Sequence, residues 1–485
     1  MSFQSLGFFV LLLGAMAVYF AVPHRWQAPV LLAASLYFYS CAGVGYLFLL
    51  LAAVAFGYGW AHLMARRTGG ARKALLAVGL AVLLGNLCFF KYYNAFGQAL
   101  ASLAAGAGWP FVPPDRNLPS PLGISFFTFV LTGYLIDIYR GKYQPERNVI
   151  DFALFASFFP LIASGPIERG GHLLPQLKAE HRFRYETFCR GASRMLWGFF
   201  KKFVLADTIG TMVGAVYTRL PDYTGPYLLL ASLLYSYQLY CDFSGYSDIA
   251  VGAARMLDIE ALENFTRPFS AGSYQGLWNR WHNSLTGWFR EYLYFPLGGS
   301  RRGALRTYVN ILVIFLVSGI WHGSTVNFAV WGLLNGVYMA AGRARAKARP
   351  LPQKRGAARY AWGVLCCYAL FTSAIVFFRA ATLPDALYVY SHLFTGWADV
   401  LRAPLSVIPV LKSMNIGRVT GLLLLGGAFF CEWVEWRAAR AGADTGAWMR
   451  ALPRGRRLAL YYGLLIVLAL YGHFGSSSFI YFNFA

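Results

Sequence analysis

The sequence predicts an all-α protein that crosses a membrane many times. Of its 485 residues, 58% are hydrophobic and only 13% are charged, and the mean hydropathy is +0.47. Soluble domains carry about 25% charged residues, roughly twice this share. Uncharged runs recur along the chain, and about 20 apolar residues are enough for one helix to cross a bilayer. A soluble enzyme, a disordered chain and a fibrous repeat are therefore excluded.

The uncharged runs define the expected membrane segments in chain order. Residues 26–65 carry no formal charge and are long enough for two helices with a turn near Ala42 and Gly43. Residues 309–342 are also uncharged and are expected to hold one spanning helix and a second segment. We expect about ten to twelve spans in all, with re-entrant and interfacial helices among them. The other expected segments carry few or no charges, and Lys201 and Lys202 interrupt one of them, 195–216. They are 6–22, 74–90, 121–139, 152–165, 195–216, 227–241, 360–378, 420–436 and 458–471.

Loop charges predict the orientation. The chain has 43 Lys and Arg against 20 Asp and Glu, a net charge of +23. The basic residues gather in the clusters 66–73, 140–147, 343–359 and 437–457, which the positive-inside rule places in the cytoplasm. The N-terminus is then outside. No basic segment carries a nucleic-acid-binding module, so we expect no nucleic-acid partner.

The region 242–302 is too polar to cross lipid, because it mixes aromatic, Gly, Pro and charged residues. Irregular polar backbone is tolerated at membrane depth where protein buries it or where it lines a wet cavity. The region is expected either to line such a cavity or to lie in the membrane interface as an amphipathic loop. In a helix, Trp278, Trp281 and Trp288 would fall near one face as an interfacial anchor.

His322 is the foremost candidate for catalysis. It lies inside the uncharged run 309–342, between Trp321 and Gly323. Ionisable side chains at membrane depth are costly and usually functional. Burial keeps an imidazole neutral and ready to accept a proton. Gly319 and Gly323 are expected to leave room for a substrate beside the ring. The alternative is a hydrogen-bonded packing histidine.

A second set of polar residues precedes this run. His282 lies in the string Arg280-Trp281-His282-Asn283, and Arg280, His282 and Arg290 could bind phosphate or orient a substrate. The string Asp242-Phe243-Ser244-Gly245-Tyr246-Ser247-Asp248 closes an apolar run, as a helix cap or as the wall of a polar cavity. No hydrolase elbow or metalloprotease motif occurs, and the seven cysteines lack metal-site spacing, so we expect no metal.

Together these strings resemble the membrane-bound O-acyltransferase family, within it the bacterial branch that O-acetylates alginate, cellulose and peptidoglycan. They run in family order over a motif-bearing core, 121–331, within a single membrane domain, 1–485. The matching strings are Pro121-Leu122-Gly123-Ile124-Ser125-Phe126-Phe127-Thr128, Tyr134-Leu135-Ile136-Asp137-Ile138-Tyr139-Arg140, Ser164-Gly165-Pro166-Ile167-Glu168-Arg169, the Asp242–Asp248 string, Glu263-Asn264-Phe265, Arg280-Trp281-His282, Tyr294-Phe295-Pro296-Leu297-Gly298-Gly299 and Trp321-His322-Gly323.

The D-alanyl transferases of teichoic acid share two of these strings, Asp-Phe-x-Gly-Tyr-Ser and Arg-Trp-His. They lack the stretch Tyr-Leu-Tyr-x-Pro-Leu-Gly-Gly that follows here, which favours the polysaccharide branch. Two positions depart from the family pattern. Ser164 stands where Ala is common, and Asn283 stands where Met is common.

The resemblance implies a ring of helices around a central tunnel, with His322 as the catalytic histidine and His282 as the second functional one. The residues expected to bind substrate or line the tunnel are Asp242, Ser244, Tyr246, Asp248, Asn264, Arg280, Trp281, Asn283 and Trp321.

The reaction implied is transfer of an acyl group, expected to be acetyl, from a cytoplasmic thioester across the membrane toward hydroxyls of a cell-surface polysaccharide. The donor is acetyl-CoA or an acyl carrier, and no cofactor is bound permanently. An extracytoplasmic esterase-like partner and the bacterial cytoplasmic membrane complete this expectation.

Two alternatives stay open. D-alanyl or longer-chain acyl transfer would keep the chain within the same family. A polytopic transporter or flippase would instead use Asp242, Asp248 and His322 as an ion relay. Inverted repeats would support the transporter, and the sequence shows none.

Overall fold

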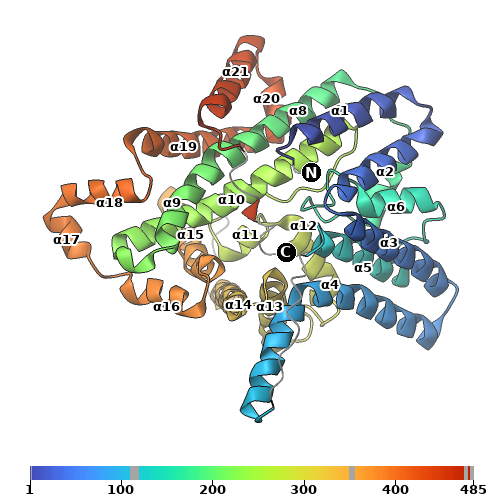
Figure 1. The fold of residues 1–485 in the computed structure, drawn as a ribbon, viewed down its shortest axis with the longest axis horizontal. Coiled ribbons are helices and arrows are strands. Elements are labelled where there is room, and N and C mark those ends of the chain that lie inside the picture. Colours follow the sequence, from blue (N-terminus) through green and yellow to red (C-terminus); the bar gives the residue numbers. More distant parts are fainter. Residues whose placement is uncertain (2, 110–119, 349–355, 475–478, 481–485) are drawn as a thin grey trace. The chain divides into compact units, whose positions relative to one another are not determined.

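The computed structural model describes residues 1–485 except 2, 110–119, 349–355, 475–478 and 481–485. The described residues form helices and no β-strand (Figure 1), which confirms the all-α class. They divide into two compact units. The first comprises Met1–Ala192 and Ala250–Glu263, and the second comprises Ser193–Ile249 and Asn264–Ile480. The single membrane domain expected above stays a prediction.

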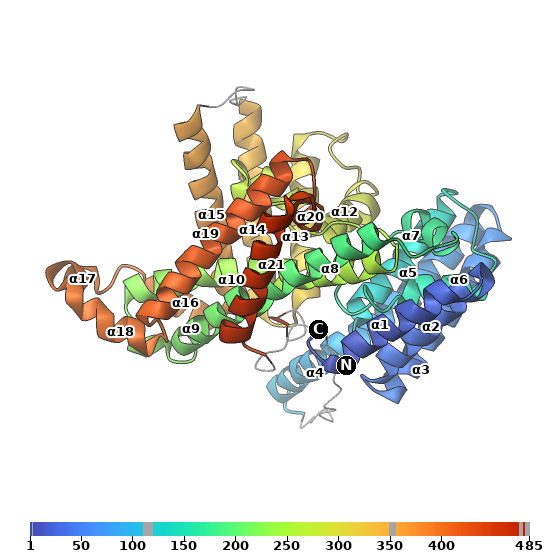
Figure 2. The ribbon, with the colours of Figure 1, turned by 90° about the horizontal axis from the view of Figure 1, so that it is seen from above.

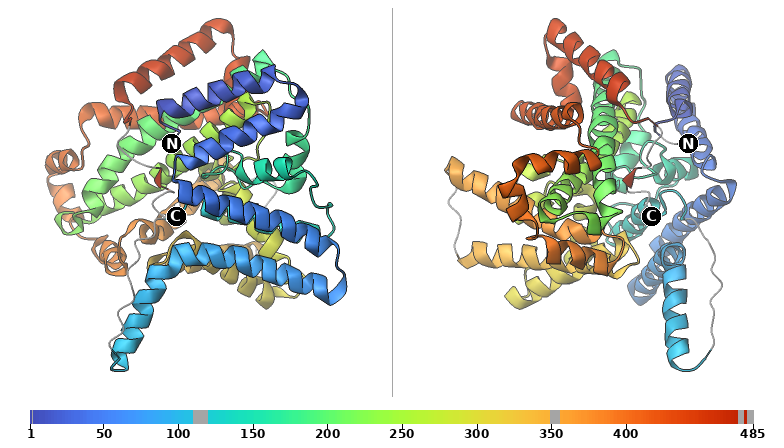
Figure 3. Two further views of the ribbon diagram at one scale, coloured as in Figure 1. Left: turned by 45° about the vertical axis from the view of Figure 1, so that its right-hand side comes forward. Right: turned by 60° about the vertical axis from the view of Figure 1, so that its left-hand side comes forward.

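The helices that lie wholly within the first unit come from its N-terminal segment, Met1–Ala192. These helices are α1 (Leu6–Ala21), α2 (His24–Ser40), α3 (Val44–Ala65), α4 (Gly69–Gly106), α5 (Ile124–Tyr139), α6 (Val149–Ser157) and α7 (Gly170–Leu177). Helix α3 packs against α4, α5 and α6. The long α4 is visibly bent along its length (Figure 3). Helix α5 begins directly after Gly123, which has a φ of +67° and whose Cβ would lie 2.1 Å from the carbonyl oxygen of Ile162. Only glycine fits this close approach.

Two helices belong to both units, namely α8 (Tyr185–Phe199) and α10 (Gly225–Met256). The remaining elements lie in the second unit. They are the π-helix η1 (Phe200–Ala206), α9 (Asp207–Tyr217), η2 (Leu220–Asp222), η3 (Pro268–Ser270), α11 (Tyr274–Trp278), α12 (Asn283–Phe289), the π-helix η4 (Arg290–Tyr294), α13 (Ala304–His322), α14 (Val326–Ala348), α15 (Ala357–Arg379), α16 (Leu383–His392), α17 (Trp397–Arg402), η5 (Pro404–Ser406), α18 (Val407–Ser413), α19 (Arg418–Arg440), α20 (Thr445–Ala451) and α21 (Arg454–Tyr471).

Within the second unit, α14 packs between α13 and α15. Figure 2 shows α14 and α15 standing side by side. The chain leaves α13 after His322 and enters α14 at Val326, so the run 309–342 holds two helices as predicted. The predicted turn near Ala42 and Gly43 is also confirmed, since α2 ends at Ser40 and α3 begins at Val44.

Five described helices are long and apolar enough to cross a membrane, namely α3, α4, α13, α15 and α19. Two shorter apolar helices, α1 and α5, add to them. The chain is therefore a multi-pass membrane protein. The larger number of about ten to twelve spans stays a prediction.

Two expected boundaries are wrong. The run 152–165 does not form one span, because α6 ends at Ser157 and the chain turns away at Phe158, two residues before Pro160. A residue that precedes proline is biased toward extended backbone, and helices end at or before it. The Asp242–Asp248 string does not close a helix either. Helix α10 continues through it to Met256.

Candidate active site

His282 and His322 line one cavity of about 280 Å³ in the second unit. Elements α11, α12, η4, α13 and α14 supply its walls, and the predicted site residue Trp281 also lines it. Its walls combine aromatic and aliphatic side chains with about as many polar ones. Polar groups that converge on an apolar cavity are typical of a small-molecule site. The polar side chains that share the cavity with the histidines are Gln275, Asn279, Thr286, Arg290, Tyr294, Ser318 and Arg343.

His322 is held among aromatic rings at the C-terminal end of α13. Its ring centroid lies 4.6 Å from that of Trp321, 5.0 Å from that of Trp331 and 5.2 Å from that of Phe378. Trp331 comes from α14 and Phe378 from α15, so three helices fix the position of the imidazole. The residue is 7% exposed.

The glycines beside His322 serve helix packing. A Cβ on Gly319 would lie 2.2 Å from the carbonyl oxygen of Phe328, and a Cβ on Gly323 would lie 2.1 Å from the Phe328 ring. A Cβ on Gly332 would lie 2.4 Å from the carbonyl oxygen of Phe315. These glycines let α13 and α14 approach closely. The prediction that Gly319 and Gly323 leave room for a substrate is therefore wrong.

His282 lies between α11 and α12 in a left-handed conformation, with φ +46° and ψ +54°. A non-glycine residue with positive φ is uncommon, and such strain gathers at functional sites. The helix is interrupted here, so Trp278 and Trp288 belong to two different helices. The single amphipathic helix expected for the tryptophans is wrong.

Asn264 holds His282 through its side chain. Its Oδ1 accepts hydrogen bonds from His282 Nδ1 at 3.2 Å and from Ser284 Oγ at 2.6 Å, and its Nδ2 donates to Ser247 Oγ at 3.1 Å. The backbone N–H of Asn283 also donates to the carbonyl oxygen of Asn264, at 2.8 Å. The sequence-predicted residue Asn264 therefore positions the histidine.

The partner on Nδ1 decides what the His282 ring can do. Burial lowers the pKa of His282 to about 3, so the ring is neutral at neutral pH. A neutral ring that donates from Nδ1 carries its lone pair on Nε2 and accepts there. In this tautomer Nε2 can accept a hydrogen bond from a ligand but cannot donate one.

We expect His282 to make the folded state sensitive to acid. Its pKa is about 3 in the folded state and about 6.5 unfolded, so the unfolded chain binds more protons between these values. Stability then falls as the pH drops below about 6.5, by up to about 1.4 kcal/mol per pH unit. Melting temperatures from pH 7 to pH 5 should fall less steeply in His282→Gln than in the wild type. An identical slope in His282→Gln would contradict this, and the exposed His24→Gln is the control.

The predicted site residues Asp242 and Asp248 take part in buried ion pairs. Lys202 Nζ lies 2.5 Å from Asp242 Oδ1 and 2.8 Å from Asp207 Oδ1. Lys201 Nζ lies 2.6 Å from Asp248 Oδ2. Two further contacts complete the network, Lys201 to Glu435 at 3.1 Å and Arg194 to Asp248 at 3.0 Å. Both lysines lie on the π-helix η1, and every side chain of the network is nearly or fully buried.

The C-terminal segment closes on this network. The backbone N–H of Ile480 donates to Asp242 Oδ2 at 3.0 Å. Lys202 Nζ lies 4.6 Å from the centre of the Phe479 ring, and the predicted site residue Tyr246 packs edge-on against the same ring at 4.5 Å. Ser244 is buried on the same helix, α10. Buried charges persist where they are paired and hydrogen-bonded in this way.

The structure thus separates the predicted site residues into two groups. In the first group, Trp281 lines the cavity and Asn264 hydrogen-bonds to His282, while Trp321 and Asn283 are the chain neighbours of the two histidines. The second group does not line the cavity and consists of Asp242, Ser244, Tyr246, Asp248 and Arg280. Arg280 donates from Nη1 to Ser270 Oγ at 2.8 Å.

Several residues of the site were missed from the sequence. Tyr294 lies within a family string and Ser318 within the uncharged run 309–342, yet only the fold shows that their hydroxyls share the histidine cavity. Lys201 and Lys202 carried a signal, since two charges interrupt an apolar run and need buried partners. In the described part of the chain, no cluster of three His, Cys, Asp or Glu side chains is placed to hold a metal.

Known proteins resemble this chain over most of its length. Residues 144–379 match the model of the MBOAT, membrane-bound O-acyltransferase family. The "Probable alginate O-acetylase AlgI" of Pseudomonas putida is 32% identical over 97% of this chain and 97% of its own. The peptidoglycan O-acetyltransferase of Helicobacter pylori is 34% identical over 79% of this chain and 76% of its own. The teichoic acid D-alanyltransferase of Bacillus subtilis is 31% identical over 52% of this chain and 67% of its own.

The part of the chain that matches the family model includes the histidine cavity. The matched region 144–379 contains both histidines and every residue that lines the cavity beside them. The relatives that span most of the chain are O-acetylases, whereas the D-alanyltransferase covers about half of it. The chain belongs to the membrane-bound O-acyltransferase family and is an O-acyltransferase of the branch that includes the alginate and peptidoglycan O-acetylases.

Proposed function

We propose that the chain moves an acetyl group from a cytoplasmic thioester, through the histidine cavity, toward hydroxyls of a cell-surface polysaccharide. The observation that carries this proposal is the cavity that His282 and His322 share with Arg290 and Arg343. Arg343 begins the basic cluster 343–359, which the charge distribution predicts to be cytoplasmic. Its guanidinium suits the phosphate groups of acetyl-CoA or of an acyl carrier.

In the proposed reaction His322 is the general base. Its neutral imidazole takes the proton of the acceptor hydroxyl as that oxygen attacks the thioester carbonyl carbon. The carbon–sulfur bond then breaks, and the proton passes to the leaving thiolate. The hydroxyls of Tyr294 and Ser318 line the same cavity and supply donors for the negative charge on the carbonyl oxygen. His282 accepts a hydrogen bond and orients a substrate.

The proposal includes a partner and a place in the cell. The immediate acceptor is an extracytoplasmic esterase-like partner, which passes the acetyl group to the polymer. The bacterial cytoplasmic membrane, where a cytoplasmic donor and an external acceptor meet, is the proposed location. The family resemblance supports both statements.

The experiment is a thioester assay with the reconstituted protein. Acetyl-CoA labelled in the acetyl group should be consumed, with free CoA released in proportion to labelled acceptor. Preference for a D-alanyl carrier would place the chain with the D-alanyl transferases instead. A transporter would leave the thioester intact, so an absence of thioester cleavage with every donor would contradict the proposal.

We expect Arg343→Gln to weaken donor binding more than turnover. A hydrogen bond to a charged group contributes about 1.5–3 kcal/mol, so the KM for acetyl-CoA should rise about tenfold or more. The kcat should change little, because Arg343 lies remote from the bond that breaks. Steady-state kinetics decide this. Arg345→Gln is the matched control, since Arg345 lies two residues away on α14 and does not line the cavity. An unchanged KM in Arg343→Gln would remove Arg343 from the donor site.

A further inference from the structure

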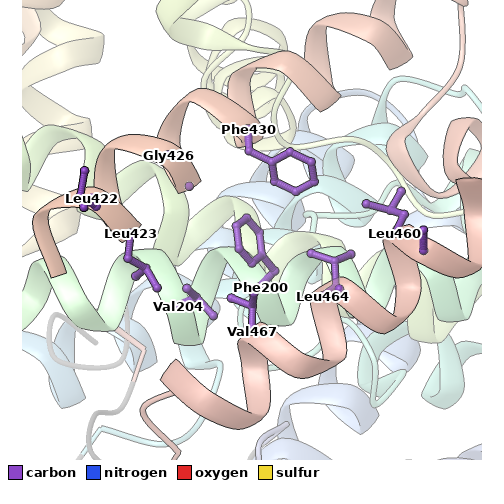
Figure 4. A pocket seen from close by; sticks show the side chains of 12 residues that line it. Phe200, Val204, Leu422, Leu423, Gly426, Phe430, Leu460, Leu464 and Val467 are labelled. Carbon is purple, nitrogen blue, oxygen red and sulfur yellow. The ribbon is translucent and has the colours of Figure 1, made fainter. Parts of the chain in front are cut away.

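A second cavity of the second unit is an apolar groove of about 460 Å³ between α19, α21 and η1. Figure 4 shows Phe200 and Val204 of η1 at its floor, with Leu423 and Phe430 of α19 and Leu464 of α21 on its sides. Every lining residue is apolar or glycine. The groove shares no lining residue with the histidine cavity, so its occupant is distinct from the acyl donor.

Glycines keep the groove open. A Cβ built on Gly426 of α19 or on Gly463 of α21 would meet no atom within 4 Å. The space beside these two residues is therefore not filled by neighbouring side chains of the second unit. In a membrane such a space is filled by lipid or by another protein, since water has no polar partner there.

A strongly basic segment adjoins one end of the groove. Residues 437–457 contain six arginines and one aspartate. On α21 the groove begins at Ala459, two residues after Arg457. On α19 its last lining residue, Phe430, precedes Arg437 by seven residues, or about 10 Å along the helix. The apolar groove thus ends where a cluster of positive charge begins.

Aromatic side chains mark the same end as the level of lipid headgroups. Trp433 and Trp436 are about two-fifths exposed on the last turns of α19. Trp433 packs edge-on against Trp448 of α20, and the Arg440 guanidinium lies 4.9 Å from the Trp436 ring. Tryptophan is enriched at membrane–water interfaces, where arginine attracts anionic headgroups.

We propose that this groove binds an anionic phospholipid, with one acyl chain between α19 and α21 and the phosphate at the arginines of 437–457. Charge complementarity supports this occupant, because each Lys or Arg near an anionic membrane surface contributes about 1 kcal/mol of attraction.

The lipid would contact the outer side of the segment that carries the buried lysines. Phe200 and Val204 line the groove, and Lys201 and Lys202 lie between them on η1. A ligand that binds the folded state alone stabilises it by mass action. Lipid binding should therefore raise the melting temperature without any dependence on acyl transfer.

The test uses the full chain, purified in detergent and titrated with phosphatidylglycerol or phosphatidylcholine. Native mass spectrometry counts bound lipid, and a thermal melt follows stability. Phosphatidylglycerol should bind one per chain and raise the melting temperature by several degrees, whereas phosphatidylcholine should do neither. Gly426→Leu and Gly463→Leu, on two different helices, should each abolish retention. The double variant Arg437→Gln/Arg456→Gln should weaken phosphatidylglycerol binding about 30-fold.

Matched controls separate the groove from general effects. Gly85→Leu changes an exposed glycine of α4 whose Cβ would also meet nothing, and Arg66→Gln/Arg67→Gln removes two exposed arginines after α3. Both should bind phosphatidylglycerol like the wild type. Equal binding of the two lipids, retention in both groove variants, or an equal loss in the Arg66 and Arg67 control would overturn the proposal. Loss of a co-purifying polypeptide from the groove variants, with lipid retained, would point to a partner helix and overturn it too.

Discussion

Replacing His322 with Gln should lower the rate of acetyl transfer by about 10²–10⁴-fold while the protein folds and melts like the wild type. Glutamine keeps approximate size and polarity but cannot act as a base at neutral pH, and loss of a general base has this magnitude. The aromatic rings of Trp321, Trp331 and Phe378 hold the imidazole without using its basicity, so the side chain can change chemically with little change in packing. Acyl transfer per folded molecule is the quantity to measure.

The matched control for this variant is His62→Gln. His62 also lies in the last turn of a candidate span, α3, but it does not line the cavity. The His62→Gln variant should transfer acetyl at the wild-type rate. If His322→Gln folds, reaches the membrane and keeps wild-type activity, His322 is a packing histidine and the proposed mechanism is wrong.

Removing the Lys202 ammonium should cost about 3–5 kcal/mol of stability, the largest stability effect expected for a single change in this chain. The Lys202 side chain is fully buried and pairs with both Asp207 and Asp242. Lys202→Met would leave two buried carboxylates without their cation, and breaking a buried pair has a cost of this size. A thermal melt in detergent measures it. Lys178→Met is the control, because the Lys178–Glu146 pair is exposed at its lysine and should contribute about 1 kcal/mol or less.

The same network separates two roles for Asp242. If Asp242 is a structural partner of Lys202 and Ile480, then Asp242→Asn should lower the melting temperature and lower activity in proportion to the folded protein. A substrate-binding or ion-relay role predicts the opposite pattern, with lost turnover at an unchanged melting temperature. That second result would move Asp242 back to the reaction path and revive the transporter alternative.

Local sequence was enough to predict an element or a candidate residue where a single strong pattern indicates it. The uncharged run 309–342 predicted one spanning helix and a second segment, which are α13 and α14, because charge-free length is a local property. The prediction that His322 is functional rests on the rarity of ionisable groups in such a run. The family strings then led to Asn264 and His282, which the structure joins by a hydrogen bond.

Tertiary packing decided what local sequence could not. From the sequence, Gly319 and Gly323 suggest open space beside the histidine. Only their close contact with Phe328 in the structure shows that these glycines serve helix packing. The left-handed backbone of His282 breaks an apparently continuous amphipathic helix. That conformation is unfavourable by itself and persists because its surroundings hold it.

The ion-pair partners of the buried charged residues could not be predicted from local sequence either. Asp242 and Asp248 are separated from Lys202 and Lys201 by about 40 positions in the chain, so no local pattern pairs them. The polar lining of the cavity has the same origin. Tyr294, Ser318 and Arg343 come from three different elements, and their common direction follows from the packing of α13 against both α14 and η4.

The most direct test of the central claim is the sidedness of acetyl transfer in sealed vesicles of known protein orientation. Acetyl-CoA, labelled in its acetyl group, is supplied on the face that carries the basic clusters, with a membrane-impermeant hydroxyl acceptor such as the purified partner on the other face. The account predicts that free CoA stays on the donor side and the label reaches the opposite side, and that His322→Gln stops both. Label that reaches the acceptor only when donor and acceptor share one face would contradict transfer through the cavity.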